Sequence, residues 1–494
     1  MKTLSNFSIL NSFNSSLRNP KSILLAFCSL LMFTACESLL EEEPRTIVTE
    51  NFYQTREDLQ AAVNSIYFPL RMVRSEQIAV LSAHTDWGYG RGSRAQYNDF
   101  VGFNPTNVNA AASRWNSFYQ GIRNANLVIK NTPLATEVAE EDRMQFIAEA
   151  KFLRALTYFD LVRNWGGVPL RTDLNVDEVD VPKASADEIY SLIIADLAEA
   201  ELALPDVASI AGRPSKMAAK TLLADVYLQL EDYQKASTLA LEVMNSGLFS
   251  LVPISSVADI QQKIFGPDLV STSEEIFALQ FARQTGQGNG LPWIMNHPST
   301  GLYNFGGAYA HYGDATNPFY KEWEDGDLRK ALWKVVDFGL GDSTLVNGKY
   351  VESQAPDNTG AGNNQPIYRY PELLLIYAEA DARLSGAVNP EALEALNMVR
   401  KRAFGLSPNQ PSEIDYLITD LNEFLDAILQ EKAYETQFEG KRWLDLKRTG
   451  RAEEFVMKNK GIMISEKHYL WPIPLEELNF NKAMDPQSDQ NPGY

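Results

Sequence analysis

The stretch "AAKTLLADVYLQLEDYQKASTLALEVMNSG" (218–247) has the pattern of two helices joined by a short turn. Its first half places apolar residues at the spacing of one helical face: Leu223, Val226, Tyr227 and Leu230. Asp232 falls in the turn, and the second helix carries the small residues Ala236 and Ala240, where two helices must approach closely. Such a pair buries its apolar face only against neighbouring helices, so the stretch predicts a helical repeat.

A second stretch, "YPELLLIYAEADARLSGAVNPEALEALNMVRKRA" (370–403), repeats this arrangement. Tyr377 takes the place that Tyr227 has in the first pair, and Asn389 with Pro390 supplies an N-cap and a first-turn proline. The two pairs predict a tetratricopeptide-like scaffold with units of about 34 residues. The expected fold class is therefore mainly α.

Further helices are expected on both sides of the first pair and after the second. The stretch 114–133 gathers apolar residues on one side: Trp115, Phe118, Ile122, Ala125 and Ile129. Ser185 and Glu188 have the spacing of a capping box at the start of another helix, over 185–205. Other long helical patterns cover 140–167 and 420–450. Helices are thus predicted to dominate 50–75, 111–247 and 371–450.

The composition of the sequence changes in two segments, 76–110 and 248–370. Both are rich in Gly, Asn, Pro and aromatic residues and have little helical periodicity. Long segments of this kind within a compact body are usually functional loops or small hairpins. We therefore expect large insertions on a helical scaffold, within a single domain that spans 36–494.

The N-terminal region has the pattern of a lipoprotein signal peptide over 1–35. Positive charges precede an almost wholly apolar run that ends in small residues before Cys36. The run is shorter than the roughly 20 apolar residues that a membrane-spanning helix needs. We predict that Cys36 is lipidated, the alternative being an ordinary buried thiol. Cleavage would remove Cys28, so the mature chain would contain no internal disulfide and would be held to the membrane by lipid alone.

The composition argues against nucleic acid as a partner. The chain has a formal net charge of −20 and no stripe of clustered Lys and Arg, which phosphate binding requires. The same charge disfavours direct adsorption to an anionic lipid surface.

An enzymatic function is also disfavoured. Glu431, Glu435 and Glu439 recur at i, i+4 and i+8, but a glycosidase needs two carboxylates on opposing walls of a cleft. We expect instead a structural ion-pair network with nearby or tertiary cations: Lys432, Lys441, Arg442, Arg448, and Arg154 or Arg163. The histidines show no metal-ligand spacing, and no phosphate-binding or nucleophile motif is found. We predict no catalytic residue, no metal and no cofactor.

Several motifs, taken in order, resemble the SusD/RagB family of outer-membrane lipoproteins. They are "NANLVIKNTP" (124–133), "AEAKFLRALTYFDLVRNWGGVPL" (148–170), "AAKTLLADVYLQLEDYQKA" (218–236), "YRYPELLLIYAEA" (368–380), "ILQEKAYETQFEGKRWLDLKR" (428–448), "YLWPIPLEELNFN" (469–481) and "QNPGY" (490–494). The resemblance implies an oligosaccharide-binding protein that acts with a TonB-dependent channel of the SusC type. Some members of the family bind peptides, and that alternative stays open.

The resemblance also implies surface display. The acidic cluster Glu41 to Glu43 after Cys36 is similar to the export signal of such lipoproteins, although a charge run is also simply a solvated tether. The expected location is the outer membrane, facing outward.

A sugar-binding site needs flat aromatic rings for the C–H faces of the sugar and fixed polar groups for its hydroxyls. The stretches 84–100 and 292–323 offer both, and Arg369 is placed to reach the same cleft. The alternative is that many of these aromatic rings pack beneath their own loops; for Trp87, next to Gly88, we favour exposure and stacking. The predicted glycan contacts are Asp86, Trp87, Tyr89, Arg94, Asn98, Trp293, Tyr309, Tyr312 and Arg369.

Overall fold

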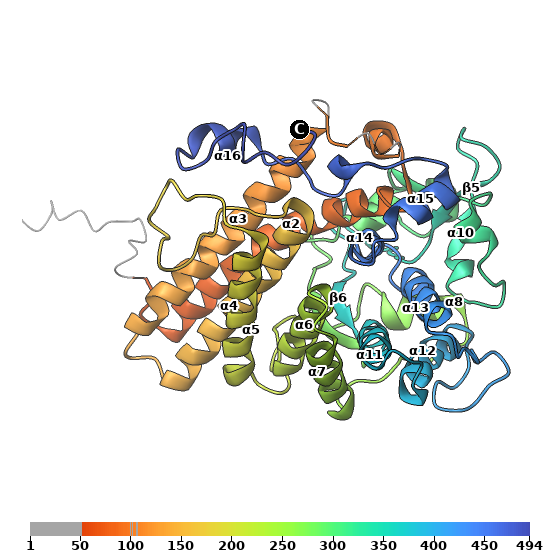
Figure 1. Ribbon diagram of the computed structural model, residues 1–494, viewed down its shortest axis with the longest axis horizontal. Coiled ribbons are helices and arrows are strands. Elements are labelled where there is room, and N and C mark those ends of the chain that lie inside the picture. Colours follow the sequence, from red (N-terminus) through yellow and green to blue (C-terminus); the bar gives the residue numbers. More distant parts are fainter. Residues whose placement is uncertain (1–51, 99, 101, 105–106) are drawn as a thin grey trace, which may run out of the picture. The chain divides into compact units, whose positions relative to one another are not determined.

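A computed structural model describes residues 52–98, 100, 102–104 and 107–494. The predicted signal peptide, Cys36 and the acidic cluster after it lie outside the described residues. The residues from Gln54 to Tyr494 form one compact unit in which helices predominate (Figure 1). The mainly helical fold expected from the sequence is confirmed.

The first half of this unit is a series of antiparallel helices, each packed on the next along the chain. They are α2 (Arg56–Ala83), α3 (Val108–Asn131), α4 (Glu140–Trp165), α5 (Ala186–Ala203), α6 (Lys216–Gln229) and α7 (Tyr233–Asn245). The predicted apolar side of α3, from Trp115 to Ile129, is buried throughout. Ser185 forms the predicted capping box with Glu188 at the start of α5. Ala236 and Ala240 on α7 are fully buried, as close helix packing requires.

The second predicted pair continues the scaffold. Helix α11 (Tyr370–Ser385) packs against α7, so the two helical pairs recognised in the sequence are neighbours in space. It is followed by α12 (Pro390–Ala403) and α13 (Leu421–Glu435), which also contact α11. The chain then continues with α14 (Arg442–Arg448), α15 (Ala452–Lys460) and α16 (Leu475–Phe480).

Two predicted boundaries were wrong. Helix α2 continues to Ala83, so the start of the predicted insertion 76–110 is helical, with Ile78 and Leu81 in the core. The single helix predicted over 420–450 is broken, because Phe438 and Gly440 adopt φ angles of 53° and 78°. Left-handed residues cannot continue a right-handed helix. Glu439 therefore lies in a turn after α13 and not on its face.

The insertion 248–370 contains short strands and helices. A four-stranded antiparallel sheet has the order β1 (Tyr89–Gly90), β3 (His311–Asp314), β5 (Thr344–Asn347) and β4 (Trp333–Val335). A second, two-stranded sheet pairs β2 (Glu275–Leu279) with β6 (Gln365–Arg369), which leads directly into α11. The short helices are α8 (Val257–Asp259), α9 (Leu291–Met295) and α10 (Pro318–Lys321).

The C-terminal motif closes the scaffold. The side-chain amide of Asn491 donates to the carbonyl oxygens of Trp165 and Trp471, at 2.8 and 2.6 Å. The indoles of these two tryptophans pack edge to face, with ring centroids 4.8 Å apart. The "QNPGY" ending thus fixes the end of α4 to the segment before α16. Across the described ranges, no helix combines the length and the apolar character needed to cross a membrane.

Candidate ligand-binding site

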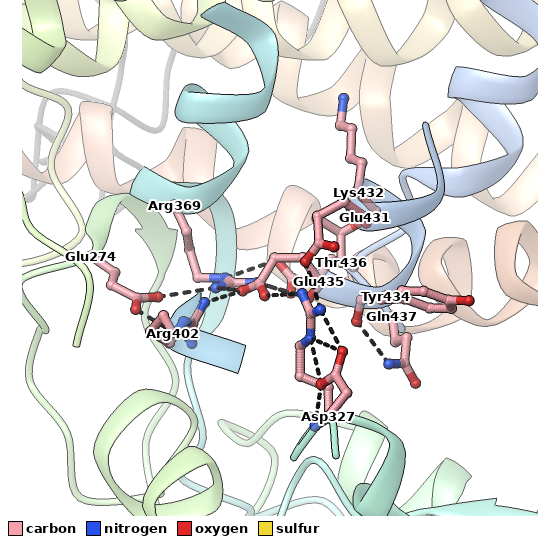
Figure 2. Close-up of polar contacts among 12 residues, drawn as sticks. Glu274, Asp327, Arg369, Arg402, Glu431, Lys432, Tyr434, Glu435, Thr436 and Gln437 are labelled. Atoms are coloured by element: carbon pink, nitrogen blue, oxygen red, sulfur yellow. Dashed lines mark hydrogen bonds and ion pairs between the residues drawn. The ribbon is translucent and has the colours of Figure 1, made fainter. Parts of the chain in front are cut away.

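The predicted acidic series forms the centre of a buried ion-pair network and does not line a cleft. The carboxylate of Glu435 accepts hydrogen bonds from Arg329, Arg369 and Arg402, at 3.0, 2.7 and 2.6 Å (Figure 2). Burial opposes its ionisation, but the neighbouring guanidinium groups outweigh that effect and hold the pKa of Glu435 below its usual range. A carboxylate locked in this way offers neither a free base nor an acid for catalysis.

An ion-pair network around Glu431, Glu435 and Glu439 was predicted, but the cations that form it are not the predicted ones. Glu439 pairs with Lys349 and Arg369, at 2.5 and 2.6 Å, and Glu431 pairs with Arg329 at 2.6 Å. Each cation proposed from the sequence forms an ion pair with a different acid. The pairs are Lys432–Asp445, Lys441–Glu372, Arg442–Asp86, Arg448–Glu379, Arg154–Asp196 and Arg163–Asp160.

The prediction that Arg369 contacts a glycan was therefore wrong. It is only 2% exposed, and its guanidinium bonds to Glu274, Glu435 and Glu439. A side chain that is saturated by buried carboxylates cannot reach a ligand at the surface.

Asp86 and Trp87 are also buried, so the prediction that they contact a glycan at the surface was wrong for both. Asp86 is fully buried and accepts hydrogen bonds from Arg442, at 3.0 and 2.7 Å. Trp87 is 4% exposed and contacts three aromatic rings, those of Phe319, Trp333 and Phe438, with centroid distances of 5.8, 5.5 and 5.2 Å. The expected exposure of Trp87 was wrong because segments far away in the sequence cover it.

Asn98 and Arg94 are partly buried and make contacts within the fold. The side-chain amide of Asn98 forms two hydrogen bonds with the backbone of Gly90. Its oxygen accepts from the Gly90 N–H at 2.5 Å, and its NH₂ group donates to the Gly90 carbonyl oxygen at 2.9 Å. Arg94 forms an ion pair with Glu76 on α2. Both residues shape the loop around β1.

The predicted tyrosines come together at the four-stranded sheet, with Tyr89 and Tyr312 on its strands and Tyr309 just before β3. Tyr89 and Tyr312 face each other across β1 and β3 and stack with centroids 5.4 Å apart. Phe338, which was not predicted, lies 5.1 Å from Tyr309 and 6.1 Å from Tyr312. Arg91 covers the Tyr309 ring at 4.1 Å. We name this partly buried group, with His297, the tyrosine cluster. Much of its ring surface is already covered by its own members.

Trp293, by contrast, lines an open pocket of about 310 Å³. Phe68 and Met72 of α2 form part of the wall and are 53% and 59% exposed. Phe281 adds a further ring, over which the Arg71 guanidinium lies at 4.8 Å. In the part of the chain that the structure describes, no other aromatic ring stacks on the Trp293 indole. We name this cavity the Trp293 pocket.

Polar groups surround these apolar walls. Arg71 donates to the carbonyl oxygen of Gln287 at 2.8 Å, and its buried Nε–H has no hydrogen-bond partner. Ser75, Glu76, Asn358 and Thr359 also line the pocket, together with backbone at Gly286, Gly288 and Gly290. Trp293 is held in place through its carbonyl oxygen, which accepts from the N–H of Ala308 at 2.6 Å. The neighbouring residue, Tyr309, belongs to the tyrosine cluster, so the two surfaces share one segment.

The residues from α2 were missed because they lie outside the predicted insertions. A signal for them exists in the sequence. Phe68 and Met72 are four residues apart, so they share a helix face, and that face lies outside the buried stripe of Val63, Ile66 and Leu70. Apolar residues that lie together on an exposed helix face can form a contiguous patch, and such patches often mark binding surfaces.

No metal-binding group forms among the residues described: no three His, Cys, Asp or Glu side chains gather in a way that could hold an ion.

Comparison with known proteins places the chain in a family. A model described as "SusD family" matches residues 339–494, and one described as "Starch-binding associating with outer membrane" matches residues 40–228. SusD-like protein P2 of Formosa agariphila is 29% identical, over 94% of this chain and 98% of its own length. SusD-like protein P38 of the same organism is 28% identical, over 97% and 99%.

Solved structures agree. A SusD superfamily protein from Parabacteroides distasonis is 25% identical with a TM-score of 0.73, covering 89% of this chain and 99% of its own. A structure named as a laminarin binding SusD-like protein is 24% identical with a TM-score of 0.73, covering 90% and 100%. The chain belongs to the SusD/RagB family.

Proposed function

We propose that this protein is a cell-surface lipoprotein that binds oligosaccharides in the Trp293 pocket and passes them to a TonB-dependent channel of the SusC type. The observation that carries the proposal is the make-up of that pocket. Trp293 and Phe68 offer flat apolar surfaces, and Arg71, Asn358 and Thr359 offer hydrogen-bonding groups beside them. A sugar presents C–H faces and hydroxyls in the same combination.

The family supports a glycan as the ligand. One of the structural relatives is named as laminarin binding, and another is named surface glycan-binding protein A, from Bacteroides fluxus. The aromatic walls also favour a glycan over a peptide, which would be held mainly by backbone hydrogen bonds.

The tyrosine cluster extends the proposed surface. Tyr309 follows the segment that is bonded to Trp293, and Tyr312 and Tyr89 lie beyond it on the sheet. We assign Tyr309, Tyr312 and Tyr89 to a second, weaker contact area. Arg94 and Asn98 would position this contact area without touching the sugar, because Arg94 pairs with Glu76 on α2 and Asn98 is bonded to Gly90 of β1.

The proposed function is binding without hydrolysis. Hydrolysis of a glycosidic bond needs two carboxyl groups on either side of it. Glu76 is the one acid among the described residues that line the Trp293 pocket, and it is paired with Arg94. The pocket thus offers a sugar a surface to bind and no opposed pair of acids.

Anchoring and export complete the proposal. Lipid on Cys36 would hold the protein at the outer membrane, and the acidic cluster Glu41 to Glu43 would direct it to the outer face. The description of the matching family model, "associating with outer membrane", supports this location.

The test replaces Trp293 by alanine and measures binding to a panel of plant, algal and bacterial glycans by calorimetry. Loss of a stacking ring removes about 1.4 kcal/mol or more, which is a tenfold loss of affinity. Phe480→Ala is the matched control, because Phe480 is an exposed ring on α16 that lines no part of the pocket. Equal affinity of Trp293→Ala and the parent protein for a bound glycan would contradict the assignment.

A further inference from the structure

A second cavity, also of about 310 Å³, lies between the α5–α6 connection and the start of β2. It shares no lining residue with the Trp293 pocket. Leu248, Phe249 and Ile276 give it apolar walls, and Thr272 and Glu275 contribute polar groups. We name it the Glu275 cavity. Its size falls within the range of small-molecule sites, which begins at about 300 Å³.

Glu275 differs from the other sheltered acids of the protein. Every fully buried Asp and Glu side chain in the described ranges has a Lys or Arg partner within the 4.0 Å limit of an ion pair, as in the Asp86–Arg442 and Glu435–Arg369 pairs. Glu275 is partly buried and has no cationic partner among those residues. Its Oε1 accepts one long hydrogen bond, at 3.5 Å, from Gln280. Burial raises the pKa of Glu275 to about 7, although the Ser271 hydroxyl opposes the shift.

The charged groups around Glu275 are already engaged elsewhere. Arg213, which lines the cavity from the α5–α6 connection, pairs with Glu149 at 2.5 Å. Asp206 on the same connection pairs with Lys216 at 2.9 Å. On β6, Arg369 is the register partner of Glu275, but its guanidinium is bonded to Glu274, Glu435 and Glu439. Neither of these two arginines pairs with Glu275, and no ion pair of Glu275 is found among the described residues.

We propose that the Glu275 cavity binds a small organic cation, namely a primary amine with a compact apolar body about the size of a six-membered ring. The ammonium group, which has three donors, would bond to the Glu275 carboxylate and to the hydroxyl of Thr272. The carbon skeleton would contact Phe249 and Ile276. The proposal is independent of glycan binding, because the two cavities have no residue in common.

The probe is cyclohexylamine, and cyclohexanol is its neutral counterpart of the same shape. Both are titrated into the purified full-length protein in detergent and followed by ligand-observed NMR. We expect the amine to bind at pH 8 and the alcohol not to bind. Because the amine stays protonated while the carboxyl group titrates near pH 7, affinity should be about tenfold weaker at pH 6.

Glu275→Gln keeps the shape of the side chain and removes its charge. It should abolish amine binding without lowering the melting temperature, since it removes an unpaired sheltered charge. Glu242→Gln, on the exposed face of α7, is the control and should bind like the parent. Failure of the amine to bind at pH 8, equal binding of the alcohol, or undiminished binding by Glu275→Gln would each overturn the proposal.

Discussion

Replacing Trp87 by alanine should destabilise the protein strongly and leave its affinity for glycans unchanged. The indole is 4% exposed and lies among Phe319, Trp333 and Phe438. It is absent from the lining of the Trp293 pocket. Both observations assign Trp87 to the core beneath the insertion, and neither assigns it to a ligand.

The expected loss can be estimated from this environment. Truncation of a buried tryptophan to alanine costs about 3–5 kcal/mol. Three ring contacts, each worth about 0.5–1.5 kcal/mol beyond buried area, put Trp87 in the upper part of that range. The indole N–H adds nothing, because it has no hydrogen-bond acceptor. We expect a loss of about 4–5 kcal/mol, a large share of the 5–15 kcal/mol that usually stabilises a protein.

Urea denaturation measures the stability, and calorimetry below the unfolding transition measures glycan affinity. Trp87→Phe is the matched control: it keeps an aromatic ring in the core and should cost clearly less than alanine. The reasoning would be refuted if Trp87→Ala unfolded like the parent protein and bound its glycan at least tenfold more weakly. That result would mean that Trp87 contacts the ligand.

The remaining predictions concern charge and anchoring. Glu435→Gln leaves three buried arginines short of a partner and should cost about 3–5 kcal/mol at pH 7 in urea denaturation. The folded pKa of Glu435 is lowered, so its contribution to stability is present above the unfolded pKa and is lost as the pH falls toward the folded pKa. The difference in stability between parent and variant should therefore be constant above about pH 5 and should shrink steadily as the pH is lowered below 4.5, the ordinary pKa of a glutamate. The pKa of Glu275 is raised to about 7, so its ionisation costs stability as the pH rises. Glu275→Gln should be the more stable protein at pH 8 and equal to the parent at pH 4, and the opposite order would contradict the burial effect. Cys36→Ser should lose a radioactive fatty-acid label, and a variant that retains the label would disprove lipidation at Cys36.

Local signals in the sequence were sufficient for the scaffold. The apolar side of α3 and the capping box of α5 are patterns within one or two turns of helix, and both are found as predicted. The break between α13 and α14 was missed because Phe438 has a backbone conformation that non-glycine residues rarely adopt. Tertiary packing fixes such a residue, and its neighbours in the sequence give no sign of it.

The candidate site was harder to predict, because exposure depends on distant segments. Trp293 and Trp87 both lie in segments rich in glycine and aromatic residues, and the sequence gives no means to tell which one is covered. Phe319, Trp333 and Phe438 cover Trp87, whereas Trp293 faces a pocket that α2 completes. Residue type alone suggested both as sugar contacts.

The ion-pair network has a consequence for the site. Arg329 and Lys349 belong to the insertion 248–370, and Glu435 and Glu439 lie at the end of α13 and just beyond it. The network therefore joins the insertion to the scaffold. Buried ion pairs contribute little net stability compared with apolar packing, but they are strongly directional.

The Trp293 pocket needs this kind of fixed junction. Phe68 and Met72 come from the scaffold helix α2, and Trp293 and Phe281 come from the insertion, so the pocket exists only while the two parts keep their positions. Loss of the Glu435 carboxylate should loosen the insertion and reduce stability and glycan affinity together. Trp87→Ala should reduce stability alone, and Trp293→Ala affinity alone. A Glu435→Gln protein that unfolds early yet binds glycan like the parent would show that the network stabilises the core without positioning the pocket.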